Sequence, residues 1–404
     1  MKRRKFIGLS GLTAMSSLAV HSGELHARIF NDSEILKIGV IGTGGRGNWL
    51  IKLIQDIPNM EVVACCDILP FRLEQGIRLA SPNAIAYGDY QALLEDKDVD
   101  AVIISTPLSM HYQMAIDALD AGKHVYCEKT MTFTIDEALD LEKKVKDSDL
   151  KFQVGYQHRY NPLYQNIHNT IQEGYMGTVT HVEAHWNRNG NWRKPVPDPK
   201  FEKLINWRMY KEYSGGLMAE LCSHQVDLID YILDAHVEKI MGMGGIDFYM
   251  DGRETYDNIY TILEYPGGLK ANFNSITTNG HEGFNVKIYG TKGTIVVKGE
   301  SGHKGYIYPE PAIIEELKTE VDGISSATMK VLEAGEPIPI LIEDFPEGDA
   351  GATSAALDHF RKCIAENLDP IANARFGKNS AITVALANKA IYEGNIQHWK
   401  EEYS

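Results

Sequence analysis

The chain has 404 residues, a length at which two domains are expected because a single hydrophobic core seldom grows so large. An apolar fraction of 44% is typical of a globular protein and excludes a largely disordered chain. The formal charge is −15, and the first 30 residues contribute +4, so the rest of the chain carries −19. This acidity argues against nucleic acid and anionic membrane surfaces as partners, and it favours a small, neutral or weakly charged substrate.

The first 28 residues have the pattern of a bacterial signal peptide. Arg3 and Arg4 precede a mildly apolar run that ends near Val20, and small and polar residues follow. The run is too short to cross a bilayer. Paired arginines favour the twin-arginine subtype over an ordinary Sec signal or a basic tail. We therefore expect 1–28 to be a twin-arginine signal peptide and the protein to reach the periplasm already folded, with no insertion into the membrane.

A dinucleotide-binding turn follows the leader. The β-branched run 36–41 predicts a strand, Gly42, Gly44 and Gly47 come next in GxGxxG spacing, and 49–57 has the pattern of a helix. Glycine is needed there because the backbone must turn tightly and approach a pyrophosphate, which then lies at the helix N-terminus. A glycine turn that binds no phosphate is the alternative. The residues of the turn that we expect to bind the cofactor are Gly42, Gly44, Gly45, Arg46 and Gly47.

The second predicted strand, 61–66, is followed by Asp67, which lies 20 residues beyond Gly47. A carboxylate at this place accepts hydrogen bonds from the adenosine ribose hydroxyls and repels a 2′-phosphate. Asp67 is therefore predicted to bind the cofactor and to favour NAD over NADP, although Arg72 lies near enough to weaken that distinction.

Strands and helices keep alternating through the first half of the chain. The runs 100–106, 123–127 and 152–156 predict strands, and 111–121 and 136–147 predict helices. This alternation is typical of a doubly wound parallel sheet with helices on both faces. Ligands of such sheets bind at the carboxyl ends of the strands. Residues at those ends complete the predicted cofactor site: Thr106, Pro107, His111, Glu128 and Lys129.

The first domain is therefore assigned to 34–157, and 158–404 is assigned to a domain for substrate binding and oligomerisation. In the second domain, 258–276 predicts a hairpin whose turn is Pro266-Gly267-Gly268. Two helices near the end of the chain are expected to pack back on the body of the protein, at 353–367 and 379–393.

Six stretches of the chain resemble one known family. They are GVIGTGGRG (39–47), STPLSMHY (105–112), AGKHVYCEKTMTFTIDEA (121–138), GYQHRYNPLY (155–164), GGLMAELCSHQVDLIDY (215–231) and IYGTKGTI (288–295). In order and spacing they resemble the glucose–fructose oxidoreductase, inositol dehydrogenase and MocA (Gfo/Idh/MocA) family. The resemblance implies an α/β protein with an N-terminal Rossmann domain and a C-terminal α/β domain whose large, open sheet is mostly antiparallel. It also implies an NAD(P)-dependent oxidoreductase whose subunits pair through that sheet as a homo-oligomer.

Two motifs of the family are altered in this chain. The family's Glu-Lys-Pro is Glu128-Lys129-Thr130 here, so the lysine is kept and the proline is not. The family's Asp, four residues before a His, is replaced by Glu220 before His224. Together with the leader, the motifs indicate an exported branch of the family.

Lys129, His224 and Glu220 are the predicted catalytic residues. Oxidation of a sugar alcohol moves a hydride from carbon to nicotinamide and a proton from oxygen to a base. An imidazole, with its ordinary pKa near ~6.5, suits His224 to be that base. Glu220, four residues earlier on a helix, is predicted to orient the ring, and Lys129 is predicted to hydrogen-bond the reacting hydroxyl. A solvated helix face is the alternative for Glu220 and His224.

Four further residues are predicted to bind the substrate. Tyr156 and Arg159 follow a predicted strand, and Arg159 fits the family's arginine near the site. The segment 185–210 holds Trp192 and Trp207 among Asn, Arg and Pro, and tryptophan faces stack well on sugar rings. The alternatives are a core tyrosine, a structural salt bridge and tryptophans that pin a loop to the body.

No metal is expected. His181, Glu183 and His185 alternate along one predicted strand, but no fourth ligand is evident in the sequence. The five cysteines fit neither a disulfide framework nor a CxxC metal pattern, so we expect them to be buried thiols.

These observations together predict an NAD(H)-dependent oxidoreductase that acts on a hydroxyl of a sugar or glycoside, with C3 as one candidate position. No nicotinamide pool exists outside the cytoplasm, so an exported enzyme must hold its cofactor tightly and regenerate it in place. One alternative is a redox-assisted glycoside hydrolase, which would oxidise the sugar, eliminate the glycosidic group, add water and re-reduce. A second alternative is a non-catalytic sugar-binding protein on the same fold.

Overall fold

The computed structural model describes residues 34–299, 304–311, 336–342, 345–346 and 348–404. The leader predicted at 1–28 lies outside these residues. Within them, no helix has both the length and the apolar character that crossing a lipid bilayer requires.

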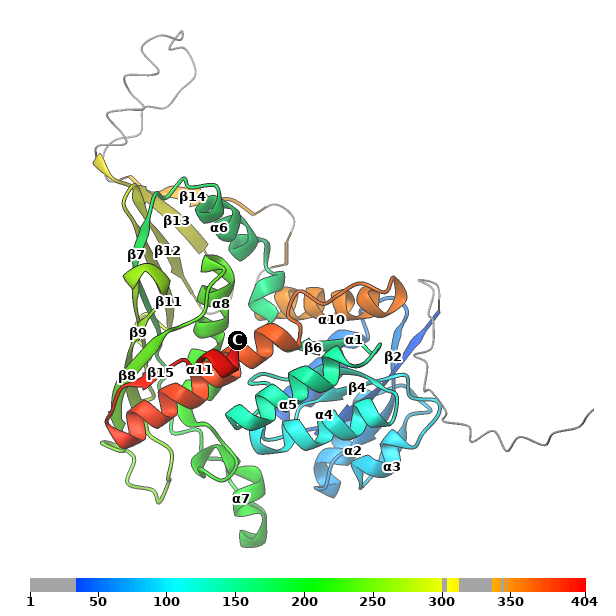
Figure 1. Cartoon of the computed structure of the whole chain (residues 1–404). Coiled ribbons are helices and arrows are strands. Elements are labelled where there is room, and N and C mark those ends of the chain that lie inside the picture. Colours follow the sequence, from blue (N-terminus) through cyan, green and yellow to red (C-terminus); the bar gives the residue numbers. More distant parts are fainter. Residues whose placement is uncertain (1–33, 300–303, 312–335, 343–344, 347) are drawn as a thin grey trace, which may run out of the picture.

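A six-stranded parallel sheet organises the first part of the chain (Figure 1). Its order is β3-β2-β1-β4-β5-β6, so the direction of winding reverses between β1 and β4 and leaves a crevice at their carboxyl ends. The strands are β1 (Leu36–Ile41), β2 (Met60–Cys66), β3 (Ile85–Tyr87), β4 (Ala101–Ile104), β5 (His124–Cys127) and β6 (Phe152–Val154). The helices that connect them are α1 (Gly45–Ile54), α2 (Pro70–Leu79), α3 (Tyr90–Leu94), α4 (His111–Asp120) and α5 (Ile135–Lys146).

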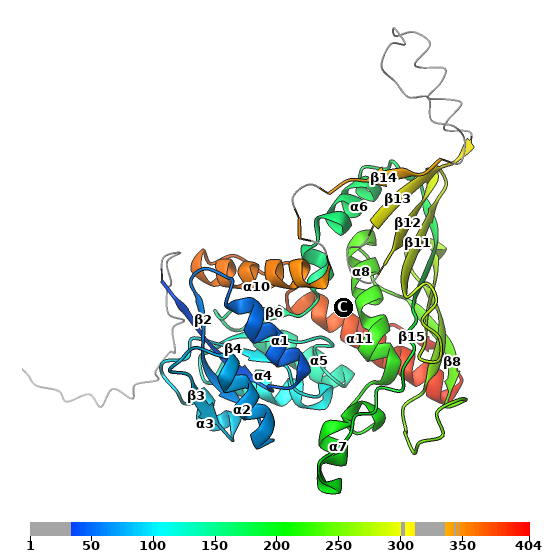
Figure 2. The ribbon, with the colours of Figure 1, turned by 180° about the vertical axis from the view of Figure 1, so that it is seen from behind.

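Helices cover both faces of this sheet, which is why β4 and β5 are buried along their whole length. On one face, α1 lies beside α10 (Asp349–Ala365), which returns from the far end of the chain (Figure 2). Leu50 of α1 and Phe360 of α10 belong to one cluster of buried apolar side chains with the strands. The last part of the chain therefore helps to hold the first sheet in place.

The second sheet is open and mostly antiparallel. Its order among the described residues is β14-β13-β12-β11-β7-β10-β9-β8-β15, with β10 parallel to β7 and every other neighbour antiparallel. The predicted fold class, a Rossmann domain followed by a mostly antiparallel α/β domain, is thereby confirmed. The strands are β7 (Val179–Trp186), β8 (Lys239–Gly245), β9 (Asn258–Glu264), β10 (Lys270–Ile276), β11 (Phe284–Gly290), β12 (Gly293–Lys298), β13 (Lys304–Pro309), β14 (Ile338–Ile340) and β15 (Gln397–His398).

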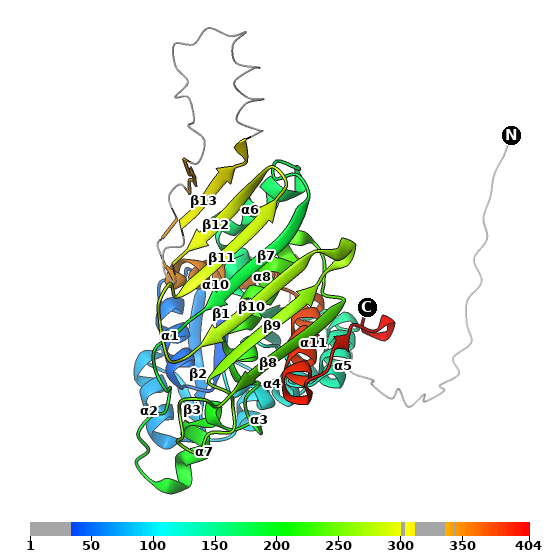
Figure 3. The same cartoon turned by 90° about the vertical axis from the view of Figure 1, so that its left-hand side faces the viewer.

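Helices lie behind one face of this sheet when its other face is turned to the viewer (Figure 3). Phe273 and Phe284 of the sheet share a buried core with Leu228 and Ile391 of the helices. Burial of such large apolar side chains is the main force that joins the two layers. The helices are α6 (Pro162–Gln172), α8 (Ser223–Leu233) and α11 (Ala374–Glu393).

Two local predictions are confirmed in detail. β9 and β10 form the predicted hairpin around Pro266–Gly268, where Gly267 and Gly268 have φ values of +78° and +82°, a region that glycine adopts without strain. The cysteines are buried free thiols, and burial raises the pKa of most of them to about 12. The thiols with this pKa are Cys65, Cys66, Cys222 and Cys363.

Candidate active site

Two pockets meet at the carboxyl edge of the parallel sheet. The first is lined by the glycine turn after β1 and by Asp67 after β2. The second is lined by Lys129 after β5 and by His224 of α8. A molecule that fills the first pocket therefore borders the second. The residues that line both are Arg46, Ser105, Thr106, Lys194, Trp207 and Arg208.

The glycines of the turn have two different roles. A Cβ on Gly47 would lie 2.0 Å from the carbonyl oxygen of Gly42, and Gly42 itself has a φ of +91°, so these two glycines allow the turn to close on itself. Among the described atoms, a Cβ on Gly44 would come within 4 Å of Arg72 alone, at 3.8 Å, and one on Gly45 would meet nothing. The backbone at Gly44 and Gly45 is thus open toward the pocket, as the approach of a diphosphate to the N-terminus of α1 requires.

Asp67 is fixed by backbone donors. Its carboxylate accepts hydrogen bonds from the N–H groups of Thr43 and Leu69, each at 2.9 Å. Burial raises the pKa of this carboxyl, against the lowering effect of these donors and of Arg72. Arg72 lines the same pocket. The pocket therefore offers both the acceptor that suits NAD and a cation that suits the additional phosphate of NADP.

Thr106 and Pro107 line the first pocket, but three of the other predicted cofactor residues line the second: His111, Glu128 and Lys129. Glu128 accepts a hydrogen bond from Arg46 Nε at 2.7 Å, which links β5 to α1. His111 lies between two backbone oxygens, with Nδ1 2.8 Å from Thr130 O and Nε2 3.0 Å from Thr106 O. Burial lowers the pKa of its ring. Glu128 and His111 thus brace the strand ends around the second pocket.

Lys129 contacts the turn Met218–Cys222, which directly precedes α8. Its Nζ donates to the carbonyl oxygens of Ala219 at 3.2 Å and Glu220 at 3.0 Å. Burial lowers the pKa of its ammonium, and the negative charges of Glu220 and Glu128 act in the opposite direction. The peptide bond between Lys129 and Thr130 is cis.

His224 is surrounded by aromatic rings and is 6% exposed. The ring centroids of His158 and Trp186 lie 5.1 and 5.4 Å from its own, and Tyr156 meets it edge-on at 6.1 Å. These rings hold the imidazole at the wall of the second pocket, where Trp186 also lies.

Glu220 was predicted to orient the ring of His224, and the structure gives its carboxylate a different partner. The Glu220 carboxylate instead accepts a hydrogen bond from Arg208 Nε at 2.7 Å. Although burial opposes it, Arg208 and Lys129 together lower the pKa of Glu220. Glu220 lies in a π-helical turn, Met218–Cys222, so the regular α-helix on which the prediction relied begins only at Ser223.

Two of the predicted substrate-binding residues lie in the core instead. Arg159 is buried and forms an ion pair with Asp227, Nη2 to Oδ1 at 2.9 Å, and its guanidinium lies 4.2 Å from the ring centroid of Phe376. Tyr156 is buried behind the ring of His224. Neither lines the second pocket. Trp192 and Trp207, by contrast, both line it.

Several pocket residues were missed by sequence reasoning. Arg208 directly follows Trp207, and Lys194 comes shortly after Trp192. The composition of this Trp- and Arg-rich segment could therefore have indicated both residues. Asp349 at the start of α10 gave no such signal, because only the fold brings it to the pocket. The residues of the second pocket that were missed are Ser105, Leu108, Gln157, Trp186, Arg188, Lys194, Arg208, Leu221 and Asp349.

His181, Glu183 and His185 lie on β7 and take part in ordinary polar contacts. Glu183 accepts a hydrogen bond from the Tyr289 hydroxyl at 2.9 Å, and His185 Nε2 lies 3.6 Å from Glu282. Across the part of the chain that the structure describes, no group of three or more His, Cys, Asp or Glu residues is placed to hold a metal ion.

Comparison with known proteins agrees with this geometry. Residues 36–156 match the model of the oxidoreductase family with an NAD-binding Rossmann fold, GFO_IDH_MocA, and 164–296 match the GFO/IDH/MocA C-terminal domain. The chain is 28% identical to scyllo-inositol 2-dehydrogenase (NAD(+)) of Bacillus subtilis over 65% of this chain and 73% of that protein. It is also 28% identical to 2,7-anhydro-N-acetylneuraminate hydratase of Escherichia coli, over 65% of this chain and 68% of the hydratase.

The fold is shared with a solved scyllo-inositol dehydrogenase from Lactobacillus casei with bound cofactor NAD(H) and scyllo-inositol. The TM-score is 0.68 at 20% identity, over 90% of this chain and 99% of that one. The two family models match the chain, and both sheets and the glycine turn agree with them. The chain therefore belongs to the Gfo/Idh/MocA family and is an oxidoreductase of that type.

Proposed function

We propose that the protein uses NAD(H) to oxidise a hydroxyl group of a sugar, glycoside or cyclic polyol. The observation that carries this proposal is the junction of the two pockets, where the glycine turn faces one and Lys129 and His224 face the other. The name of its relative, scyllo-inositol 2-dehydrogenase, supports a polyhydroxylated ring as the substrate class. C3 is one candidate for the oxidised position.

The first pocket fits a dinucleotide. The open backbone at Gly44 and Gly45 presents N–H groups at the N-terminus of α1, where a diphosphate would be held. Asp67 would accept the ribose hydroxyls, and we propose NAD over NADP because a fixed carboxylate repels a 2′-phosphate. When bound, the nicotinamide supplies the acceptor for a hydride from the substrate carbon.

The second pocket supplies the groups that handle the proton. A Lys ammonium has three N–H donors, and two of those of Lys129 bind the carbonyls of Ala219 and Glu220. The third remains for the substrate oxygen, and burial makes this ammonium a stronger donor by lowering its pKa. An imidazole nitrogen of His224 receives the hydroxyl proton, and Trp192 and Trp207 pack on the ring of the substrate.

A redox-assisted glycoside hydrolase is the second candidate, because one of the relatives is named as a hydratase of an anhydro sugar. It begins with the same oxidation, which acidifies the neighbouring C–H bond, and continues with elimination, addition of water and re-reduction. Lys129 and His224 would have the same roles in the simple oxidation and in the redox-assisted hydrolysis.

The deciding experiment is turnover of a panel of polyols and glycosides in heavy water, with products read by NMR and mass spectrometry. We expect a keto product or a reduced partner sugar with the glycosidic bond intact. Free aglycone with deuterium at C2, and no net change in the cofactor, would show the hydrolase to be correct. Binding without any turnover would instead favour a sugar-binding protein.

We also propose export and self-association. The twin-arginine pattern supports a folded, periplasmic protein that keeps its cofactor, and replacing Arg3 and Arg4 by Lys should leave it in the cytoplasm.

Self-association would use the second sheet. A second copy of the chain would cover the open face of β8 and β9, where Met243 lies opposite Tyr260 and Met241 lies opposite Ile262. All four of these side chains are exposed.

A further inference from the structure

A segment of the second domain covers the pocket of the first. Residues 194–213, called the clasp below, contain the short helix α7 (Glu202–Ile205), which lies away from the second sheet and beside α2 in Figures 1 and 2. Leu204 and Ile205 of the clasp line the first pocket together with Ile68 and Leu69, which precede α2. The pocket assigned to the dinucleotide thus has one wall from each domain.

An aromatic contact joins the clasp to the first domain. The rings of Phe201 in the clasp and Phe71 in α2 meet edge to face, with their centroids 6.2 Å apart. Such a pair holds two elements together without a covalent or charged link. Phe201 directly precedes α7, so the contact holds this part of the clasp against the first domain.

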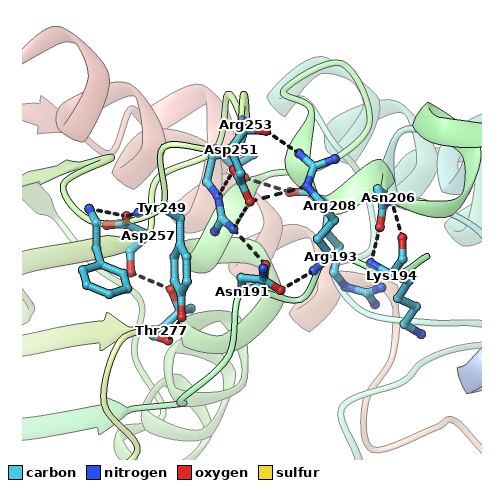
Figure 4. A network of polar contacts seen from close by, with 12 residues as sticks. Asn191, Arg193, Lys194, Asn206, Arg208, Tyr249, Asp251, Arg253, Asp257 and Thr277 are labelled. Carbon is cyan, nitrogen blue, oxygen red and sulfur yellow. Dashed lines mark hydrogen bonds and ion pairs between the residues drawn. The ribbon is translucent and has the colours of Figure 1, made fainter. Parts of the chain in front are cut away.

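The base of the clasp is braced within its own domain (Figure 4). Lys194 and Asn206 are joined by two hydrogen bonds, Lys194 N to Asn206 Oδ1 at 2.7 Å and Asn206 Nδ2 to Lys194 O at 3.0 Å. Arg193 binds Glu202 of α7 and also Asp251, which in turn binds Arg253 at 2.8 Å. These contacts set the direction in which the clasp leaves the domain.

The clasp brings positive charge to the pocket. Lys194 lies near Arg208 and Arg72, and burial, with these two guanidiniums, lowers the pKa of its ammonium. The neighbouring carboxylates are already engaged, Glu220 by Arg208 and Asp67 by two backbone N–H groups. Within the described part of the chain, Lys194 forms no ion pair with a carboxylate. The Lys194 side chain lines both pockets, so its ammonium is well placed to bind an anion that enters there.

We propose that the clasp closes the dinucleotide pocket and that Lys194 binds an anionic oxygen of the dinucleotide's diphosphate, so that the cofactor stays bound between turnovers. This inference rests on the proposed function only in taking the first pocket as the cofactor site. It adds a binding residue from the second domain, which the glycine turn alone does not supply. It also gives a physical reason for retention, because a diphosphate would have to break its contact with Lys194 and open the Phe71–Phe201 pair before leaving.

The test is the rate at which NADH leaves the full-length protein. Protein loaded with NADH is mixed with excess NAD, and the loss of bound-NADH fluorescence is followed for wild type, Lys194→Met and Phe201→Ala. We expect Lys194→Met to raise the release rate about tenfold or more, the ratio that a charge-assisted hydrogen bond supports. It should also weaken the dependence of release on salt, whereas Phe201→Ala should raise the rate and leave the salt dependence unchanged.

Lys200→Met is the matched control, because Lys200 lies in the same segment, is 66% exposed at its side chain and pairs with Asp198. It should release NADH as wild type does. Wild-type release rates in both Lys194→Met and Phe201→Ala, with unchanged thermal unfolding, would overturn the inference. A Lys194→Met variant with wild-type release and a raised KM for the sugar would do so as well, by assigning Lys194 to substrate. Failure of the wild type to bind NADH at all would instead refute the proposed function.

Discussion

Arg208 Nε donates a hydrogen bond to Glu220 Oε2 at 2.7 Å, while the backbone oxygen of the same Glu220 accepts one from Lys129 Nζ at 3.0 Å. One residue therefore connects the arginine of the clasp to the lysine at the end of β5. The negative charge of Glu220 stabilises the charged form of Lys129, and its carboxylate binds Arg208 rather than the ring of His224.

Replacing Glu220 by Gln should move the alkaline limb of the kcat/KM profile to lower pH, by about one pH unit, because loss of a nearby carboxylate lowers the pKa of a lysine. The measurement is the pH dependence of turnover with a fixed substrate. If Glu220 acted on His224 instead, the acid limb would move and the alkaline limb would stay. Glu264→Gln, which removes a carboxylate on the second sheet that pairs with Lys270, should leave both limbs in place.

His224→Ala and Lys129→Ala should each lower kcat by about 10²- to 10⁴-fold, the range typical for loss of a positioned acid or base. Both should bind NADH as wild type does, because the two side chains line the second pocket and not the first. Turnover and NADH fluorescence titration measure the two effects separately. Near-normal turnover in both variants would mean that other groups move the proton.

The first domain was predictable because its signals are local. A β-branched strand, a glycine turn and a helix within 20 residues specify the pocket between β1 and α1, and the carboxylate after β2 follows from the same unit. Trp192 and Trp207 line the second pocket, and the composition of their segment alone had marked them as candidates.

The rest of the site depends on tertiary structure that no local pattern encodes. Arg159 was predicted to meet substrate, but Asp227, 68 residues later, binds it in the core. Glu220 pairs with Arg208, which lies in another segment of the chain, and helix periodicity within 220–224 cannot indicate such a partner. Asp349 reaches the pocket only because α10 packs on the first domain.

Gly44→Val should abolish NADH binding while the protein stays folded. A Cβ on Gly44 points into the pocket and meets only the far end of Arg72, so the substitution fills the space of the diphosphate without disturbing the protein. Gly47→Ala is the contrasting variant, because its Cβ would lie 2.0 Å from a backbone oxygen and should destabilise the fold by about 1–3 kcal/mol or more. NADH titration and thermal unfolding distinguish the two effects. If Gly44→Val binds NADH with normal affinity, the backbone at Gly44 does not form the diphosphate site.

The stability of the protein should fall between pH 7 and pH 5, in part through His124. Burial lowers the pKa of its ring to about 4, and its Nδ1 accepts a hydrogen bond from Lys151 N at 2.9 Å, which only an unprotonated nitrogen can do. In the unfolded chain the ring titrates near its ordinary value, so over this range the unfolded state binds a proton that the folded state does not. By linkage, the free energy of unfolding decreases as the pH falls, with His124 contributing up to about 2 kcal/mol by pH 5.

His124→Asn keeps an acceptor and removes the titration. The variant should therefore lose less stability than wild type when urea unfolding at pH 7 is compared with unfolding at pH 5. Equal losses in the two proteins would show that His124 is not a source of the acid sensitivity.

Tyr260→Glu should dissociate the proposed oligomer. Tyr260 is 51% exposed on β9 and lies opposite Met243, which is 71% exposed on β8, so a charge there would stand in the middle of the apolar face. Tyr175→Glu places the same charge at a tyrosine that is 68% exposed after α6, away from that face, and should leave the assembly intact. Light scattering after size exclusion measures the mass of each variant, and NADH binding confirms that each is folded. If the wild type is a monomer, the sheet does not pair subunits. The same conclusion would follow if the double variant Tyr260→Glu/Met243→Glu kept the mass of the wild-type oligomer, because an apolar interface does not survive two buried carboxylates without partners.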